Sequence, residues 1–189
     1  MPLSCSGSPI RRLAISASFW ATIAMTAILP GVAISQDAAA TVETAADPEA
    51  IDRGFAVWKS QDCIGCHGWA GDGQRIGENP EGPSLRALEM DAEVLKEVIL
   101  CGRPGTLMPY HDPRAYADDR CYGMTRTDLE GLNMLEGRAM TSEEADDLVA
   151  YMFARMIGRP ETPNQEDCRA YYGERPFCDR LPTAAEQGL

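Results

Sequence analysis

Positive charge is what this sequence has little of. Its 189 residues hold 17 lysines and arginines against 29 aspartates and glutamates. Two of the basic residues, Arg11 and Arg12, precede residue 36 and none of the acidic ones does, so residues 36–189 carry 15 basic against 29 acidic side chains, a net charge of −14. Binding to nucleic acid depends on neutralising phosphates with lysine and arginine, so this composition excludes nucleic acid as a partner. The acidic surplus favours a partner with a basic docking surface, or it simply serves solubility.

Histidine is scarce as well, with His67 and His111 as its two instances. His67 ends a stretch that reads C-I-G-C-H from Cys63 onward. A zinc site would need a second pair of ligands, for which the chain offers only His111 and scattered cysteines. A thioredoxin-like dithiol would need a βαβ context, which the sequence lacks. The spacing therefore predicts one haem c, attached through Cys63 and Cys66 on one helical turn, with His67 as an iron ligand.

The N-terminus predicts export. Residues 1–12 hold no acidic residue and end in an arginine pair, residues 13–29 are apolar, and Pro30 with small residues up to Ser35 follows. This pattern is typical of a signal peptide at residues 1–35 and indicates a periplasmic protein. A retained membrane anchor is the alternative, because the apolar stretch approaches the ~20 residues that a spanning helix needs. A twin-arginine signal is disfavoured, because a haem that is joined after export requires the chain to cross unfolded.

Six cysteines follow the predicted signal, which suits two haem thioethers and two disulfides in an oxidising compartment. The four outside the C-x-x-C-H stretch permit three pairings. We favour Cys101 with Cys121 and Cys168 with Cys178, each closing a short loop and contributing about 3 kcal/mol. The first bridge would either hold the loop it closes in a functional geometry or merely stabilise that loop.

Helical periodicity predicts an all-α domain. A flexible acidic leader is expected at residues 36–48, a folded domain at 49–158 and a C-terminal extension at 159–189. Helices are expected at 48–60 after the N-cap Asp47, at 91–100, and from a capping box at Thr141 and Glu144 to about residue 157. Loops are expected at 68–86 and 101–138, with one helical turn at 127–132. The tail is proline-rich and looks too polar to form a second core.

A six-coordinate haem needs a second axial ligand. Met108 lies 41 residues after His67, in a loop that follows the predicted helix 91–100. A thioether ligand stabilises ferrous iron and suits a carrier of high potential. Met108 is therefore the preferred ligand. The other candidates are Met90, Met124, Met134, Met140 and His111.

The sequence resembles the class I cytochrome c family over about residues 50–158. The resemblance rests on Gly54, Trp58, the C-x-x-C-H stretch, residues 82–85 (G-P-S-L), residues 106–109 (T-L-M-P) and Tyr151. It implies an all-α domain wrapped around one covalently bound haem, with long loops and a disulfide-tied tail. It also implies that the first and last helices cross with Gly54 against Tyr151, and that the Pro83 carbonyl orients His67. The 32 residues from Pro109 to Met140 depart from small family members and make ligation by Met108 less secure.

The resemblance implies an electron carrier and not an enzyme. One electron at a time would pass from a periplasmic dehydrogenase, such as a quinoprotein, to a terminal oxidase or another cytochrome, with no catalytic residue. Two alternatives stay open: a haem-bearing subunit of a larger oxidoreductase, and a haem enzyme or gas sensor with an open distal site beside Tyr110. Candidate donors to the haem propionates are Trp69, Arg75, Arg86 and Arg103.

Overall fold

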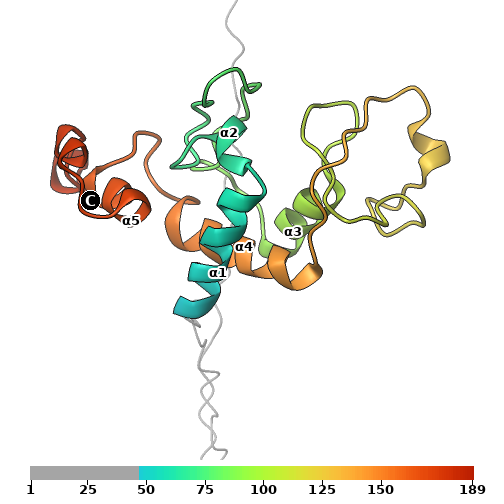
Figure 1. Ribbon diagram of the computed structural model, residues 1–189, viewed down its shortest axis with the longest axis horizontal. Helices are drawn as coiled ribbons and strands as arrows, with labels where there is room; N and C mark the ends of the chain where they lie inside the picture. The colour runs from blue at the N-terminus through green and yellow to red at the C-terminus, as the bar shows by residue number, and fades with distance from the viewer. Residues whose placement is uncertain (1–46) are drawn as a thin grey trace, which may run out of the picture. The chain divides into compact units, whose positions relative to one another are not determined.

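A computed structural model describes residues 47–189, so the predicted signal peptide and the leader up to residue 46 lie outside the described residues. The α-helices are α1 Pro48–Ser60, α2 Cys63–His67, α3 Ala92–Cys101, α4 Ser142–Arg155 and α5 Gln165–Tyr172 (Figure 1). Short 3-10 helices follow at η1 Arg126–Leu129, η2 Pro176–Arg180 and η3 Ala185–Gln187. Residues 47–189 contain two isolated bridges and no strand, which confirms the all-α prediction. No helix in this part of the chain is both long and apolar enough to cross a membrane.

The three predicted helices are present, and each begins at a side-chain cap: the caps at Asp47 and Thr141 were predicted, whereas Asp91 caps the helix that was expected to start with it. The Asp47 carboxylate accepts a hydrogen bond from the Glu49 amide at 3.1 Å, and the Asp91 carboxylate accepts one from the third residue of α3 at 2.9 Å. Thr141 and Glu144 form the predicted capping box, with bonds of 3.1 and 2.7 Å. Side-chain acceptors at these positions satisfy amides that a helix N-terminus leaves unpaired.

The main core lies where α1 crosses α4 (Figure 1). Gly54 faces Tyr151 at this crossing, as the resemblance implied, and a Cβ atom on Gly54 would lie only 2.7 Å from that of Tyr151. Four residues further along α1, the Trp58 ring packs 6.3 Å from the Tyr151 ring, centroid to centroid. The buried members of this core are Val57, Trp58, Leu85, Leu95, Ile99, Met140, Ala145, Leu148, Val149, Tyr151, Met152 and Met156.

The chain between α3 and α4 makes a long excursion that has a small core of its own. Irregular structure and one helical turn were expected there, and η1 is that turn. The small core was not expected. Its centre is the predicted disulfide between Cys101 and Cys121, and Ala115, Tyr116 and Leu129 are buried around it.

The tail forms no core of its own among the described residues, but it contains a helix that was not predicted and it joins the main core. Residues 165–172 form α5, and Asn164 caps it by accepting a hydrogen bond from the Asp167 amide at 3.0 Å. Tyr171 of α5 packs on the main core, with its ring 5.2 Å from that of Phe55 on α1. The predicted Cys168–Cys178 disulfide joins α5 to η2, and both cysteines are buried.

A buried ion pair fastens the tail to the rest of the domain. The Arg86 side chain is 0 % exposed, and its Nη2 donates to the Asp167 carboxylate at 2.7 Å. The same guanidinium donates to the carbonyls of Ala70, at 3.0 Å, and Pro160. Arg159 also donates to Asp167, at 3.2 Å. Each buried charge is thus paired and hydrogen-bonded, which is the condition for burying it.

Gly54→Ala tests the crossing of α1 and α4. Alanine at an open helical position stabilises a helix by about 0.5–1 kcal/mol relative to glycine. At Gly54 the added Cβ would overlap the backbone of Asp147 and the side chain of Tyr151. We expect the free energy of unfolding to fall by about 1–3 kcal/mol, measured by circular dichroism in denaturant. Asp52→Ala, at an exposed position of α1, is the control, and equal stability of the two variants would refute close packing at Gly54.

Asp167→Asn tests the attachment of the tail. This change leaves Arg86 buried with an uncompensated charge, so we expect a loss of about 3–5 kcal/mol and faster proteolysis of residues 159–189. Asp179→Asn is a matched control in the same segment. Asp179 pairs with Arg169 at an exposed position, where an ion pair contributes only about 0–1 kcal/mol to stability. Equal proteolysis rates for the two variants would show that the ion pair does not hold the tail.

Candidate functional site

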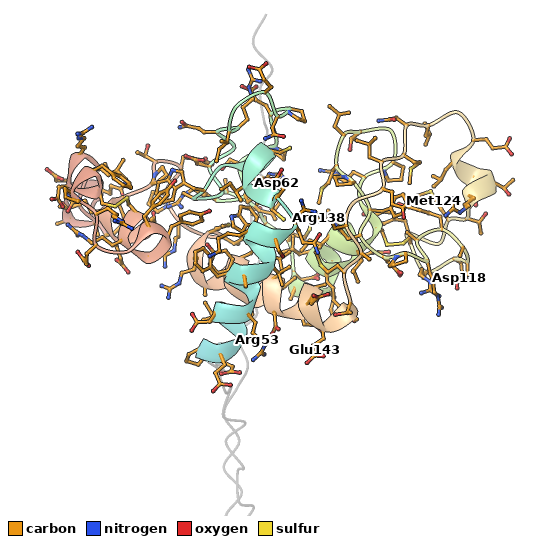
Figure 2. All side chains as sticks on the ribbon, viewed as in Figure 1. Arg53, Asp62, Asp118, Met124, Arg138 and Glu143 are labelled. Carbon is orange, nitrogen blue, oxygen red and sulfur yellow. A yellow bond between two sulfur atoms is a disulfide. The ribbon has the colours of Figure 1, made fainter. Side chains whose placement is uncertain are left out.

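The C-x-x-C-H stretch forms α2, a single helical turn set off from α1 by a sharp bend. Asp62, labelled in Figure 2, makes this bend in the left-handed conformation with φ 60°. Cys63 and Cys66 are three positions apart on α2, and residues at this spacing share a helix face. Within residues 47–189 they are the only cysteines outside a disulfide. The two thiols are therefore free to react on one face of one turn.

His67 ends α2 with its ring held by the following loop. Its Nδ1 lies 2.9 Å from the Pro83 carbonyl oxygen, where the resemblance placed that carbonyl. A carbonyl only accepts, so Nδ1 carries the proton and donates, and the lone pair of Nε2 is left for a metal. Burial lowers the pKa of His67, although the bond to Pro83 raises it, so the ring is neutral as a ligand must be.

Gly82 is required beside this ring. A Cβ atom at Gly82 would lie 2.7 Å from Nδ1 of His67. The Gly82 amide also donates to the Cys66 carbonyl at 2.9 Å, and the Gly73 amide donates to the His67 carbonyl at 2.8 Å. The loop is thus bonded directly to α2 and brings the Pro83 carbonyl to the imidazole.

The two thiols do not suit the zinc and dithiol alternatives. Burial raises the pKa of Cys63 to about 12. Burial, and then the charge of Asp62, also raises the pKa of Cys66. A redox dithiol reacts as a thiolate and needs a lowered pKa, so the raised values disfavour that alternative. A zinc site needs further ligands close to the two thiols. No group of three or more potential metal ligands is assembled within residues 47–189.

The residues present fit a covalently bound haem. Two free thiols and a neutral histidine with an open Nε2 are the donors that haem c requires. Trp58, 1 % exposed, packs its ring 6.4 Å from that of His67, centroid to centroid. Its indole Nε1 is buried and has no hydrogen-bond partner among residues 47–189. An orphaned donor of this kind is expected where a bound group supplies the missing partner.

Met108 differs from the other candidate methionines in its surroundings. Met140 is buried in the main core and Met90 packs against it, whereas Met124 and Met134 pack against the small core of the excursion. Met108 is part of neither cluster of the described residues and is partly exposed in its loop. These four candidate methionines are therefore core filler, and Met108 is not.

His111, the other candidate ligand, is buried beside the same loop. Its Nδ1 lies 2.9 Å from the Arg138 carbonyl, and a Cβ atom on Gly137 would touch its ring. Burial lowers the pKa of His111, and the bond to Arg138 partly offsets this. His111 thus ties the loop that carries Met108, residues 102–110 (the Met108 loop), to the segment that returns toward α4, residues 131–140 (the returning segment).

The structure corrects one of the propionate candidates. Nε, Nη1 and Nη2 of the buried Arg86 each donate to a protein acceptor, so Arg86 is not available to a haem propionate. Arg75 donates to the Asn79 carbonyl at 3.1 Å. Trp69 packs its ring against those of Tyr171 and Tyr172, at 5.9 and 5.4 Å. Arg103 is exposed in the Met108 loop.

The contacts of residues 131–140 were not predicted from the sequence. This segment pairs with the Met108 loop. Its Arg138, labelled in Figure 2, donates to the carbonyl of Ser60 at the end of α1. Gln61 donates from Nε2 to the Ala139 carbonyl at 3.4 Å. Nothing in the local pattern of residues 131–140 predicts these bonds, because their partners are distant in the sequence.

Comparison with known families gives one match. The family model described as Cytochrome c matches residues 51–154, which is more than half of the chain. No match was found among curated proteins or among solved structures.

Gly82→Ala tests the orientation of His67. The added Cβ would push the imidazole away from the Pro83 carbonyl, and a weaker bond at Nδ1 makes Nε2 a poorer donor. We expect the reduction potential of the haem-loaded protein to rise and its free energy of unfolding to fall by about 1–3 kcal/mol. The measurement is a potentiometric titration followed by absorbance. Ser84→Ala, in the same loop, is the control, and a potential unchanged by Gly82→Ala would count against this role.

Proposed function

The chain belongs to the cytochrome c family, and on that premise we propose that it is a periplasmic carrier of single electrons with one haem c. A cytochrome c domain implies electron transfer through a covalently bound haem, and members of the family are generally carriers. In this chain Cys63 and Cys66 would form the thioethers, and His67 and Met108 would be the axial ligands. Pro83 would orient His67.

One observation supports this proposal more strongly than any other. The two thiols of α2 are free, while the adjacent His67 donates from Nδ1 to Pro83 and presents an unprotonated Nε2. A c-type haem takes these groups from its protein on the proximal side: two thiols for the thioethers and one imidazole nitrogen for the iron.

The chain's own residues have a positioning role in the transfer. When bound, the haem supplies an iron that alternates between the ferric and ferrous states. His67 keeps its proton on Nδ1, directed at Pro83, so that no proton needs to move at this site. The buried side chains of Trp58 and Leu95 belong to the core that excludes water and lowers the local dielectric constant.

The proposed location and partners rest on composition and disulfides. Two disulfides, Cys101–Cys121 and Cys168–Cys178, support an oxidising compartment such as the periplasm. A net charge of −14 over residues 36–189 supports a partner with a basic docking surface. A periplasmic dehydrogenase, for instance a quinoprotein, would be the electron donor, and an oxidase or another cytochrome the acceptor.

Exposed leucines favour a second candidate, a fixed haem-bearing subunit of a larger oxidoreductase. Leu107, Leu132 and Leu135 are 56, 49 and 39 % exposed, and they lie on the Met108 loop and its returning segment. Apolar side chains grouped in this way are typical of surfaces that contact another protein. A carrier would purify alone as a monomer, whereas a subunit would purify in a stable complex with its oxidoreductase.

Met108→Ala tests the proposed axial pair. We expect the oxidised wild-type protein to show the weak long-wavelength absorption band of methionine bound to ferric haem, and the variant to lack it. Met124→Ala is the control, because Met124 packs in the excursion and should leave the band unchanged. Visible spectra of the purified oxidised and reduced proteins provide the measurement.

Two outcomes would contradict the axial pair. A band that persists in Met108→Ala would reject Met108 as ligand, and His111→Ala would then be the next variant. If the wild type lacks the band and its reduced form binds carbon monoxide readily, the distal site is open. A haem enzyme or gas sensor would then replace the carrier.

A further inference from the structure

The Met108 loop is covered along one side by the segment that returns toward α4. The Gly105 amide donates to the Asn133 carbonyl at 2.9 Å, on the N-terminal side of Met108. On its C-terminal side, the Tyr110 amide donates to the Leu135 carbonyl at 2.9 Å, and the Gly137 amide donates to the Tyr110 carbonyl at 2.8 Å. Residues 131–140 therefore bond to the loop on both flanks of the proposed ligand.

Asn133 makes the contact that reaches furthest into the loop. Besides its carbonyl bond to Gly105, its side-chain Nδ2 donates to the Thr106 carbonyl at 3.1 Å. The Thr106 hydroxyl in turn accepts from the Met108 amide at 3.1 Å and donates to the Arg103 carbonyl at 2.7 Å. Asn133 thus holds the backbone carbonyl of Thr106, and the hydroxyl of the same Thr106 holds the backbone of Met108.

Packing alone does not fix this loop. Met108 belongs to neither hydrophobic cluster of the described residues, and the preceding Leu107 is 56 % exposed. A loop without buried side chains is held by its hydrogen bonds and by the segments that bear the partner groups. The Met108 amide is held by Thr106, and Thr106 is held by Arg103 within the loop and by Asn133 from the returning segment.

The returning segment is itself anchored at the proximal side of the site. Arg138 donates to the Ser60 carbonyl at the end of α1, and Gln61 donates to the Ala139 carbonyl at 3.4 Å. Cys63 begins α2 directly after these residues. The segment thereby connects the backbone that carries Cys63 and His67 with the loop that carries Met108.

We propose that residues 131–140 are a brace for the distal ligand, with Asn133 and Thr106 as positioning residues for Met108. This inference rests on the proposed role of Met108 as an axial ligand. The brace keeps the closed state, in which the sulfur is bound to iron, more populated than a state in which the loop has moved away. It gives a function to the long excursion that distinguishes this chain from small cytochromes.

The brace predicts how readily an external ligand displaces Met108. Imidazole binds ferric haem only when methionine has left, so its apparent affinity rises with the population of the open state. A lost hydrogen bond shifts that population about fivefold, the equivalent of about 1 kcal/mol. Asn133→Ala and Thr106→Val should each bind imidazole about fivefold more tightly than the wild type.

The experiment is an imidazole titration of the full, haem-loaded, oxidised protein, followed by the loss of the methionine band. Thr106→Ser retains the hydroxyl and should restore the wild-type affinity. Thr127→Ala, an exposed change elsewhere on the excursion, is the control. Because both bonds hold Met108 through Thr106, their effects should overlap. The gain in imidazole affinity of the double variant Asn133→Ala/Thr106→Val should therefore be smaller than the product of the gains of the two single variants.

The outcomes separate this inference from the proposed function. If the methionine band survives in Met108→Ala, Met108 is not the axial ligand, and the brace is rejected as well. If Met108→Ala loses the methionine band while Asn133→Ala and Thr106→Val bind imidazole with wild-type affinity, Met108 is the ligand and the brace is rejected. If Asn133→Ala does not accumulate as folded protein, the comparison of Thr106→Val with Thr106→Ser decides alone, and equal affinities for those two overturn the proposal.

Discussion

The close approach of α1 to α4 at Gly54 is the contact on which the described structure depends. Only a glycine lets the backbone of α4 come this near, because a Cβ atom there would overlap Asp147 and Tyr151. The approach brings Trp58 against Tyr151 and leaves the Trp58 ring beside that of His67, at 6.3 and 6.4 Å between centroids. After the bend at Asp62, α2 begins with only two residues separating it from the end of α1. The position of the C-x-x-C-H turn is therefore a consequence of how the two long helices pack.

The two proposed axial ligands are held by different means. His67 belongs to a helix fixed by the main core, and its ring is oriented by the Pro83 carbonyl in a loop bonded back to α2. Met108 lies on a loop outside both cores, and it depends on the disulfide at Cys101, the hydroxyl of Thr106 and the returning segment. Histidine and thioether ligation differ in strength, and a thioether is the weaker donor. With Met108 as the proposed ligand, the long excursion around it would compensate for the smaller contribution of that bond.

Local signals in the sequence were sufficient for much of this fold. Asp47 and Thr141 each predict a helix start correctly, because a cap is recognised from a few neighbouring residues. The crossing at Gly54 and the Pro83 carbonyl came from family resemblance. α5 was missed although Asn164 and Asp167 form a recognisable capping pattern, because the polar and proline-rich composition of the tail was given more weight. The partner of Arg86 could not be predicted, since it lies 81 positions away and no local pattern links the two residues.

The tail and the excursion are attached to the domain in contrasting ways. The excursion has its own small core and disulfide, bonds to the end of α1 through backbone carbonyls, and reaches the main core only at its end, through Met140. The tail packs on the main core through Tyr171 and is fastened by the buried pair of Arg86 and Asp167. A buried ion pair contributes little net stability compared with apolar packing, yet breaking it by removing one partner is strongly destabilising. We therefore interpret the pair as a device for specificity: the guanidinium of Arg86 finds its carboxylate and carbonyl acceptors together in only one arrangement of the tail.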